Sequence, residues 1–204
     1  MMLLETMRVS AEGEVYLLDR HLDRLQNSAR HFSFICEREK VQASIAGAIR
    51  HFEKPSRLRL LLSSVGECHL ESEPLSARRL PRYLQISPVR IDSKNPLLYH
   101  KTSERQVYED TRRGCGADAD VLLVNERGEV TETTTANVAL LRGGKWITPP
   151  VSCGLLPGVM WAELLATGEV VEGVMRVDEL NAGETVRCFN SVRGIFDLCL
   201  NPGS

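Results

Sequence analysis

Hydrophobic and polar positions in the first third of the chain follow two different periods. The apolar stretch Leu3–Val9 predicts a short strand. Apolar residues then recur every three or four positions, which predicts a helix over residues 20–32 with Asp19 as its N-cap. A second pattern of this kind predicts an amphipathic helix over residues 39–52. These elements indicate an αβ unit at the start of the chain.

Three more strands are expected to complete that unit. The leucine-rich stretch 57–63 predicts one strand, and segments 68–72 and 83–88 are expected to pair with it. The stretch that follows contains Pro96 and little periodicity, which is typical of a linker. We therefore expect a small α/β domain over residues 1–92 and a linker over residues 93–99.

The second half of the chain is mostly β in pattern. Residues 120–125 predict a buried strand, and a hairpin turning at Gly143-Gly144 is expected after it. A helix is expected over residues 158–167, followed by strands over 185–190 and 195–200. We therefore expect residues 100–204 to form a larger, β-rich domain, so that the fold class is α+β with two domains.

Composition excludes several classes of partner. The 204 residues are 43% hydrophobic and 25% charged, with a formal net charge of -2, which gives no electrostatic reason to expect nucleic acid or an anionic membrane as partner. No apolar run approaches the roughly 20 residues of a membrane span, and the first residues lack the pattern of a signal peptide, so a cytoplasmic location is expected. Six scattered cysteines indicate reduced thiols, and neither they nor the five histidines have metal-ligand spacing, so no metal site is expected.

Four short segments contain residues that suit catalysis, although each also has an ordinary structural interpretation. Lys101, in His-Lys-Thr, is a candidate nucleophile or base if its surroundings lower its pKa, or else a surface lysine. The glycine-rich segment 154–160 enters a predicted helix, whose first amides favour a phosphate, but it also fits a plain loop. Glu132, among four threonines, is either an exposed strand-end charge or a buried partner for a protonated ring nitrogen. Segment 189–194 contains Asn-Ser before a glycine, which is typical of a turn and also suits phosphate contact.

The segments occur in an order that resembles the class IV (fold-type IV) family of aminotransferases that depend on pyridoxal 5'-phosphate (PLP). The order is DRHLDRLQNSA, HKT, VTETTTANV, GLLPGVM and NSVRG, and the resemblance extends over nearly the whole chain. It implies the two-domain fold of D-amino-acid aminotransferase-like enzymes, PLP as cofactor, a small amino substrate and a homodimer. The segments LLETMRV, LLDRHLDRL and HKTSERQVYE are similar to the 4-amino-4-deoxychorismate lyase branch, which also occurs as the C-terminal domain of para-aminobenzoate synthase component I.

The resemblance assigns a role to individual residues. It implies that Lys101 forms a Schiff base with PLP and transfers the proton, and that Glu132 pairs with the pyridine nitrogen. The remaining cofactor-binding positions, all implied to contact the phosphate, are Arg24, Val159, Met160 and Ser191. Weaker candidates for binding substrate carboxylates are Thr6, Arg105 and Arg193.

Within this family the expected reaction is conversion of 4-amino-4-deoxychorismate to 4-aminobenzoate and pyruvate, a step of folate biosynthesis. Two alternatives stay open: a class IV aminotransferase acting on D- or branched-chain amino acids, and a degenerate PLP-binding domain without catalysis. The last is motivated by two departures from the family pattern. Trp161 stands where the family commonly has arginine, and the chain begins almost at the Leu-Glu-Thr-Met segment.

Overall fold

The computed structural model describes residues 1–50, 52–75 and 81–201, and these divide into two compact units. The first unit contains residues 1–78 and 100–104, and the second contains residues 79–99 and 105–204. The units therefore differ from the expected domains, because residues 79–92 belong with the second unit and residues 100–104 with the first. Where independently folding domains begin and end stays a prediction.

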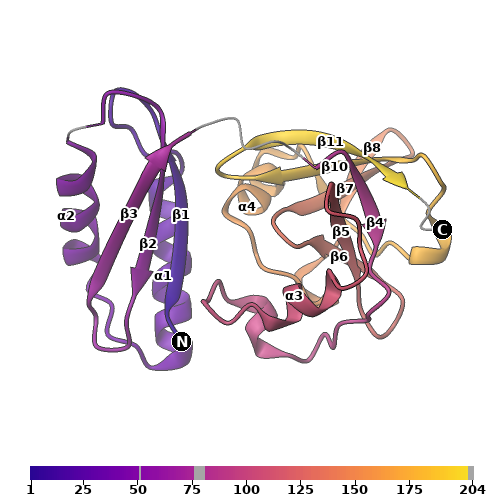
Figure 1. The fold of residues 1–204 in the computed structure, drawn as a ribbon, viewed down its shortest axis with the longest axis horizontal. Helices are drawn as coiled ribbons and strands as arrows, with labels where there is room; N and C mark the ends of the chain where they lie inside the picture. Colours follow the sequence, from indigo (N-terminus) through magenta and orange to yellow (C-terminus); the bar gives the residue numbers. More distant parts are fainter. Residues whose placement is uncertain (51, 76–80, 202–204) are drawn as a thin grey trace. The chain divides into compact units, whose positions relative to one another are not determined.

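The first unit is a three-stranded antiparallel sheet with two helices (Figure 1). Its strands are β1 (Leu3–Val9), β2 (Ser56–Leu62) and β3 (Cys68–Pro74), in the order β1-β2-β3. Its helices are α1 (Leu18–Phe32) and α2 (Arg38–Ile49). These elements match the predicted strands and helices of this region to within a few residues.

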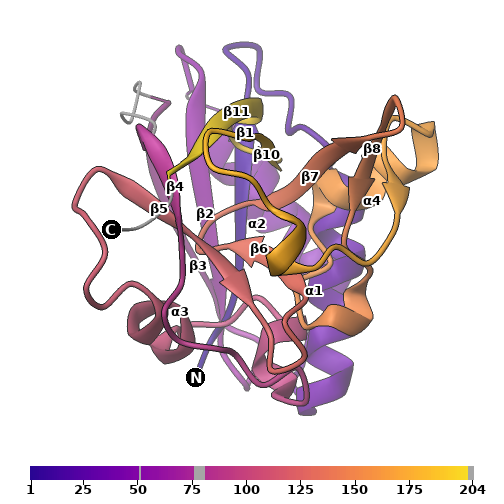
Figure 2. The same ribbon diagram turned by 90° about the vertical axis from the view of Figure 1, so that its right-hand side faces the viewer.

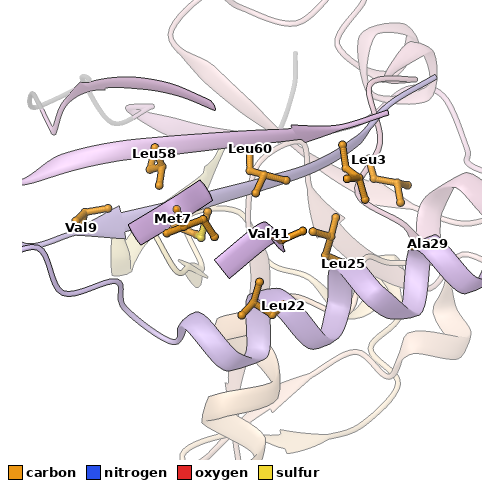
Figure 3. Packing of buried hydrophobic residues seen from close by; sticks show 11 residues of the cluster. Leu3, Met7, Val9, Leu22, Leu25, Ala29, Val41, Leu58 and Leu60 are labelled. Atoms are coloured by element: carbon orange, nitrogen blue, oxygen red, sulfur yellow. The ribbon is translucent and has the colours of Figure 1, made fainter. Parts of the chain in front are cut away.

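One face of this sheet forms a core with both helices. Every second residue of β2 is buried, and Leu58, Leu60 and Leu62 are fully buried. Figure 3 shows that side chains from the strands point toward leucines of α1, among them Leu22 and Leu25. Because alternate side chains of a strand lie on opposite faces, this pattern gives one apolar face to the helices.

The start of α1 differs from the prediction. Leu17, and not Asp19, is the N-cap, and it adopts the left-handed conformation with φ 55°. Asp19 lies in the first helical turn, where its carboxylate accepts a hydrogen bond of 2.9 Å from Arg38. A carboxylate at this place is favoured by the partial positive charge of the helix start. A sequence pattern cannot distinguish this preference from the preference for aspartate at the N-cap.

The second unit contains most of the strands and two α-helices (Figure 2). Its strands are β4 (Tyr83–Ile86), β5 (Ala119–Val124), β6 (Val130–Thr133), β7 (Asn137–Arg142), β8 (Lys145–Thr148), β9 (Val171–Glu172), β10 (Thr185–Asn190) and β11 (Gly194–Asn201). Its α-helices are α3 (Gln106–Thr111) and α4 (Val159–Thr167), and short 3-10 turns cover Pro96–Tyr99, Val151–Cys153 and Val177–Glu179.

Strands β10, β11, β4, β5, β6 and β7 close into a barrel, and β8 and β9 continue the sheet beyond β7. The order is β10-β11-β4-β5-β6-β7-β8-β9, and a second pairing joins β10 to β7, so the ring runs from β10 through β7 and back. Strand β4 lies in this ring, parallel to both β5 and β11. The expectation that residues 83–88 pair with the strand at 57–63 was therefore wrong. Pairing between segments far apart in sequence cannot be deduced from local pattern.

Apolar side chains fill the inside of the barrel, while α4 packs on its outside. Strand β7 shows the division, since Val138 and Leu140 belong to the inner cluster and Ala139 packs with Trp161 of α4. The barrel is therefore a packed scaffold, and polar side chains with a functional role are to be sought at its ends and loops. In the described part of the chain, no helix is both long and apolar enough to cross a membrane.

Candidate active site

Lys101 lies in the first unit, on a short segment that adds to the free edge of β1. The Leu4 amide donates to the Lys101 carbonyl over 2.9 Å, and Thr102 forms an antiparallel bridge with Leu3. The Ser103 amide donates to the Met2 carbonyl over 2.9 Å. Lys101 itself is half-buried.

Arg24 is bound to a buried carboxylate of the same unit. Its Nε and one terminal nitrogen donate to the two oxygens of Glu5 over 2.9 and 2.6 Å. His21 Nδ1 lies 2.6 Å from Glu5 Oε2, and Glu5 is only 2% exposed. Burial raises the pKa of Glu5, but the charges and hydrogen bonds of Arg24 and His21 outweigh burial and bring that pKa down to about 2. Glu5 therefore fixes the guanidinium by a two-point contact.

Glu132 is buried in the second unit and is surrounded by donors. The Tyr108 hydroxyl and the Leu156 amide donate to its Oε1 over 2.9 and 3.2 Å, and the Asn137 amide group lies 3.4 Å from Oε2. Burial, the charge of Glu132 and the hydrogen bond between Tyr108 and Glu132 together raise the pKa of Tyr108 well above its usual value. A buried carboxylate needs such donors. Because Glu132 is buried, it is not the exposed charge at a strand end that was the alternative interpretation of the sequence.

The predicted phosphate-binding segment does enter a helix. Gly158 is the N-cap of α4, and the first hydrogen bond of the helix runs from the Ala162 amide to the Gly158 carbonyl. The amides of Val159 and Met160 therefore precede the hydrogen-bonded turns, which is the arrangement that binds anions at helix starts. A Cβ at Gly158 would lie 2.0 Å from Asn137 Oδ1, so this position has room only for glycine.

Trp161, the main departure from the family pattern, packs against the barrel. It is 9% exposed and belongs to an apolar cluster with Phe189 and Leu164. Its indole Nε1 is buried and has no hydrogen-bond partner among the described residues. Its ring therefore serves packing between α4 and the barrel.

Ser191 lies in a turn that follows β10. The Val192 and Arg193 amides donate to Asn190 Oδ1 over 3.1 and 2.8 Å, which shapes the turn, and Ser191 is 8% exposed. The Asn190 side chain also donates to the Thr135 carbonyl over 3.2 Å. This turn is therefore tied to the Thr-rich loop that follows Glu132.

Asn137 connects the three predicted segments of the second unit. Its side chain approaches Glu132 and donates to the Leu156 carbonyl over 2.9 Å, and its backbone pairs with Phe189 of β10. Glu132, the start of α4 and the turn at 190–193 therefore lie around one asparagine. Neither Asn137 nor Tyr108 was singled out from the sequence, although an asparagine inside the apolar run that starts β7 is a detectable exception.

The three weaker candidates occupy different places. Arg105 donates to the Thr134 carbonyl over 2.6 Å, and its guanidinium carbon lies 4.5 Å from the centre of the Tyr108 ring. Arg193 lies over the Phe196 ring at 5.9 Å, and Thr6 is half-buried on β1 in the first unit. Of the three, Arg105 contacts residues that flank Glu132.

The residues present fit PLP. The second unit offers a buried carboxylate for a protonated ring nitrogen and the start of a helix for a phosphate, and each has the required sign of charge. The first unit offers a half-buried lysine amine and a fixed guanidinium. Glu5 and His21 were missed in the sequence, although a glutamate at an inward position between Leu3 and Met7 marks the strand as unusual.

Known proteins resemble this chain along nearly its whole length. A protein of Schizosaccharomyces pombe named "putative aminodeoxychorismate lyase" is 34% identical over 194 residues, covering 90% of this chain and 84% of its own. The crystal structure of a "putative amino-acid aminotransferase" from Mesorhizobium loti is 36% identical, with TM-score 0.89, and covers 98% of this chain and 99% of its own.

A third protein shows the same fold at lower identity. The PLP-bound form of a hypothetical aminotransferase from Mycobacterium tuberculosis is 20% identical, with TM-score 0.81, and covers 98% of this chain and 81% of its own. The family model for amino-transferase class IV matches residues 2–199. The α+β fold, with its small N-terminal sheet and β-barrel, and the sequence thus agree, and the chain belongs to the class IV aminotransferase family.

Proposed function

We propose that this chain binds PLP through Lys101 and converts 4-amino-4-deoxychorismate to 4-aminobenzoate and pyruvate. The observation that carries the proposal is the match to the lyase-named relative from Schizosaccharomyces pombe, together with the Glu132 environment that suits the cofactor. In this proposal the protein serves folate biosynthesis in the cytoplasm.

Each residue of the proposed site has a separate task. Glu132 pairs with the ring nitrogen, and Tyr108 and Asn137 hold its carboxylate in place. Arg24, the amides of Val159 and Met160, and Ser191 bind the phosphate. When bound, PLP supplies an electron sink that makes the carbon next to the substrate amine acidic.

Lys101 is proposed to hold the cofactor covalently and then to act as the base. When substrate is bound, its Nζ would take the proton from the ring carbon that carries the amine. The electron pair left on that carbon would form a new ring double bond as the neighbouring carbon–oxygen bond breaks, and the departing enolpyruvate would take up a proton to become pyruvate. The ring becomes aromatic, which makes the reaction strongly downhill. Arg105, next to Tyr108, is the candidate to bind a substrate carboxylate, with Arg193 and Thr6 as weaker ones.

The proposal is tested with purified protein, PLP and 4-amino-4-deoxychorismate. Pyruvate should form at a rate well above that of the uncatalysed reaction, and Lys101→Ala should abolish both pyruvate formation and the visible absorption of bound PLP. Arg90→Ala, at an exposed position of the second unit, is the control and should keep both. Absorption by bound PLP without pyruvate formation would reject the lyase.

The Mesorhizobium loti relative favours a second candidate, an amino-acid aminotransferase. The same lysine would then move the proton in the transfer of an amino group to a 2-oxo acid, and the bound cofactor would supply the electron sink. Transfer of amino groups from D- and branched-chain amino acids to 2-oxoglutarate, measured over a panel, distinguishes this candidate. A protein that binds PLP and fails in both assays would support the non-catalytic alternative.

We also propose that the active protein is a homodimer, as the family resemblance implies. Sedimentation analysis at micromolar concentration tests this directly, and a protein that is monomeric while fully active would reject it.

A further inference from the structure

The residue before Lys101 is held by three side chains of α1. His100 Nδ1 lies 3.0 Å from Ser28 Oγ. The His100 ring lies 4.3 Å from the His31 ring, tilted by 31°, and meets the Phe32 ring edge-on at 4.9 Å. A half-buried histidine with a hydrogen bond and two ring contacts has little freedom to turn.

The residue after Lys101 is also fixed. Thr102 is 3% exposed and bridges to Leu3, and its hydroxyl accepts a hydrogen bond of 3.2 Å from the Glu104 amide. The Lys101 carbonyl accepts from Leu4. The Cα of Lys101 is thus anchored through the backbone on one side and through the His100 ring on the other.

We propose that His100 is a positioning residue, which through Ser28, His31 and Phe32 fixes the backbone from which the Lys101 amine projects. The inference rests on the proposed role of Lys101 in holding PLP. A lysine that must repeatedly release and recapture a cofactor gains from a fixed backbone, because the amine then returns to one place.

The same helix also carries Arg24. Arg24 precedes Ser28 by four residues, so the two lie one turn apart on the same side of α1. Glu5 fixes Arg24, and Ser28 fixes the neighbour of Lys101. One helical face therefore orients both residues of the first unit that are proposed to contact PLP.

Charge makes this anchor sensitive to pH. His31 on α1 and the adjacent Lys101 are titratable groups that lie beside His100. Burial, and then the neighbouring His31, lower the pKa of His100, so the ring stays neutral at pH 7 and above. Protonation of the His100 ring at lower pH would place a positive charge in this half-buried contact with α1 and weaken it.

Three variants separate the contacts of His100. His100→Asn keeps a polar group near the position of Nδ1 and loses the ring. His100→Phe keeps a ring and loses the bond to Ser28. Ser28→Ala leaves His100 in place and removes only its partner. His69→Gln, at an exposed position of β3, is the matched control.

The PLP affinity and its pH dependence are measured by visible absorption. Borohydride reduction and mass analysis of the Lys101 peptide then show whether PLP is attached to Lys101. We expect His100→Phe and Ser28→Ala to bind PLP roughly fivefold to tenfold more weakly, as loss of one hydrogen bond gives. His100→Asn, which loses the ring contacts with His31 and Phe32, should also bind PLP more weakly. His100→Phe should also shift the acid side of the pH profile, because the group that titrates there is gone. His69→Gln should match the wild type in both respects.

The outcomes distinguish this inference from the proposed function. If the wild type attaches no PLP to Lys101, the proposed function fails and this inference falls with it. If the wild type attaches PLP while the variants keep its affinity and pH profile and lose only Tm, His100 is merely structural and the inference is overturned. If the His100 variants do not fold, Ser28→Ala decides alone, and wild-type affinity in that variant rejects the inference.

Discussion

Glu5 shows how one buried charge organises a helix and a strand. Its pKa of about 2, against 4.5 for a free glutamate, corresponds to roughly 3 kcal/mol in favour of the ionised form. Glu5→Gln removes that charge and leaves Arg24 and His21 without their counter-ion. We therefore expect the free energy of unfolding to fall by about 2–4 kcal/mol, measured by urea denaturation at pH 7. Glu12→Gln, at an exposed turn position, should change it by less than about 0.5 kcal/mol.

The pH dependence of stability gives an independent check on Glu5. Because its pKa is lower in the folded state, the unfolded chain takes up the proton first as the pH falls. The contribution of Glu5 is fully present above about pH 4.5 and is lost as the pH falls toward 2. In this range stability should decline less steeply for Glu5→Gln than for the wild type. Parallel curves would contradict the assignment.

Tyr108 is the second residue with a predictable effect. Its hydroxyl donates to Glu132 over 2.9 Å, and its raised pKa keeps that proton in place across the physiological range. Tyr108→Phe should weaken PLP binding roughly threefold to tenfold in a spectroscopic titration, because Glu132 loses one of its donors. Tyr16→Phe, in the first unit beside Arg8, should leave the affinity unchanged. Equal losses in both variants would assign the effect to general stability.

At the level of elements, the start of α4 requires glycine at its N-cap, because there is no room for a side chain at Gly158. Gly158→Ala would bring a Cβ to 2.0 Å from Asn137 Oδ1, and Asn137 must then move away from Glu132 and the Leu156 carbonyl. We expect a loss of about 1–3 kcal/mol in unfolding free energy and a weaker affinity for PLP. Gly47→Ala in α2 has nothing within 4 Å and should instead stabilise by about 0.5–1 kcal/mol. Stabilisation by both changes would reject the steric argument.

Local pattern predicted most elements and failed where pairing is distant. The strands β1, β2 and β10 and the helices α1 and α4 follow from apolar spacing, because each buries one face. Strand β4 was assigned to the wrong sheet, since its partners are β5 and β11, and Tyr83 of β4 pairs with Cys199 of β11, 116 residues later in the chain. The N-cap of α1 was misplaced because Leu17 adopts a left-handed conformation, which cannot be predicted from a leucine at that position.

At the level of the whole molecule, the sequence motifs identified candidate site residues but not the contacts that hold those residues in place. Glu132 and the start of α4 were both expected, but their connection through Asn137 depends on β6 and β7 lying side by side and on the bond from Asn137 to the Leu156 carbonyl. The Glu5 and Arg24 pair likewise depends on the packing of α1 against β1. Such contacts arise from tertiary structure, so local sequence pattern does not identify the residues that position the others.

The two units have separate cores, and this leads to a prediction about unfolding. Leu60 belongs to the cluster of the first unit and Leu122 to that of the barrel, and both are fully buried. Replacing either by alanine should cost about 2–5 kcal/mol. Both tryptophans, Trp146 and Trp161, lie in the second unit, so their fluorescence follows the barrel, whereas far-UV circular dichroism follows the whole chain.

Leu60→Ala should therefore lower the urea midpoint of part of the circular dichroism signal and leave the midpoint of tryptophan fluorescence nearly unchanged. Leu122→Ala should lower the fluorescence midpoint directly. The reason is that an unfolding transition follows the core that it exposes, and the residues of these two cores do not overlap. If Leu60→Ala moves both signals by the same amount, the units unfold as one cooperative structure, and the first unit then depends on the barrel for its stability.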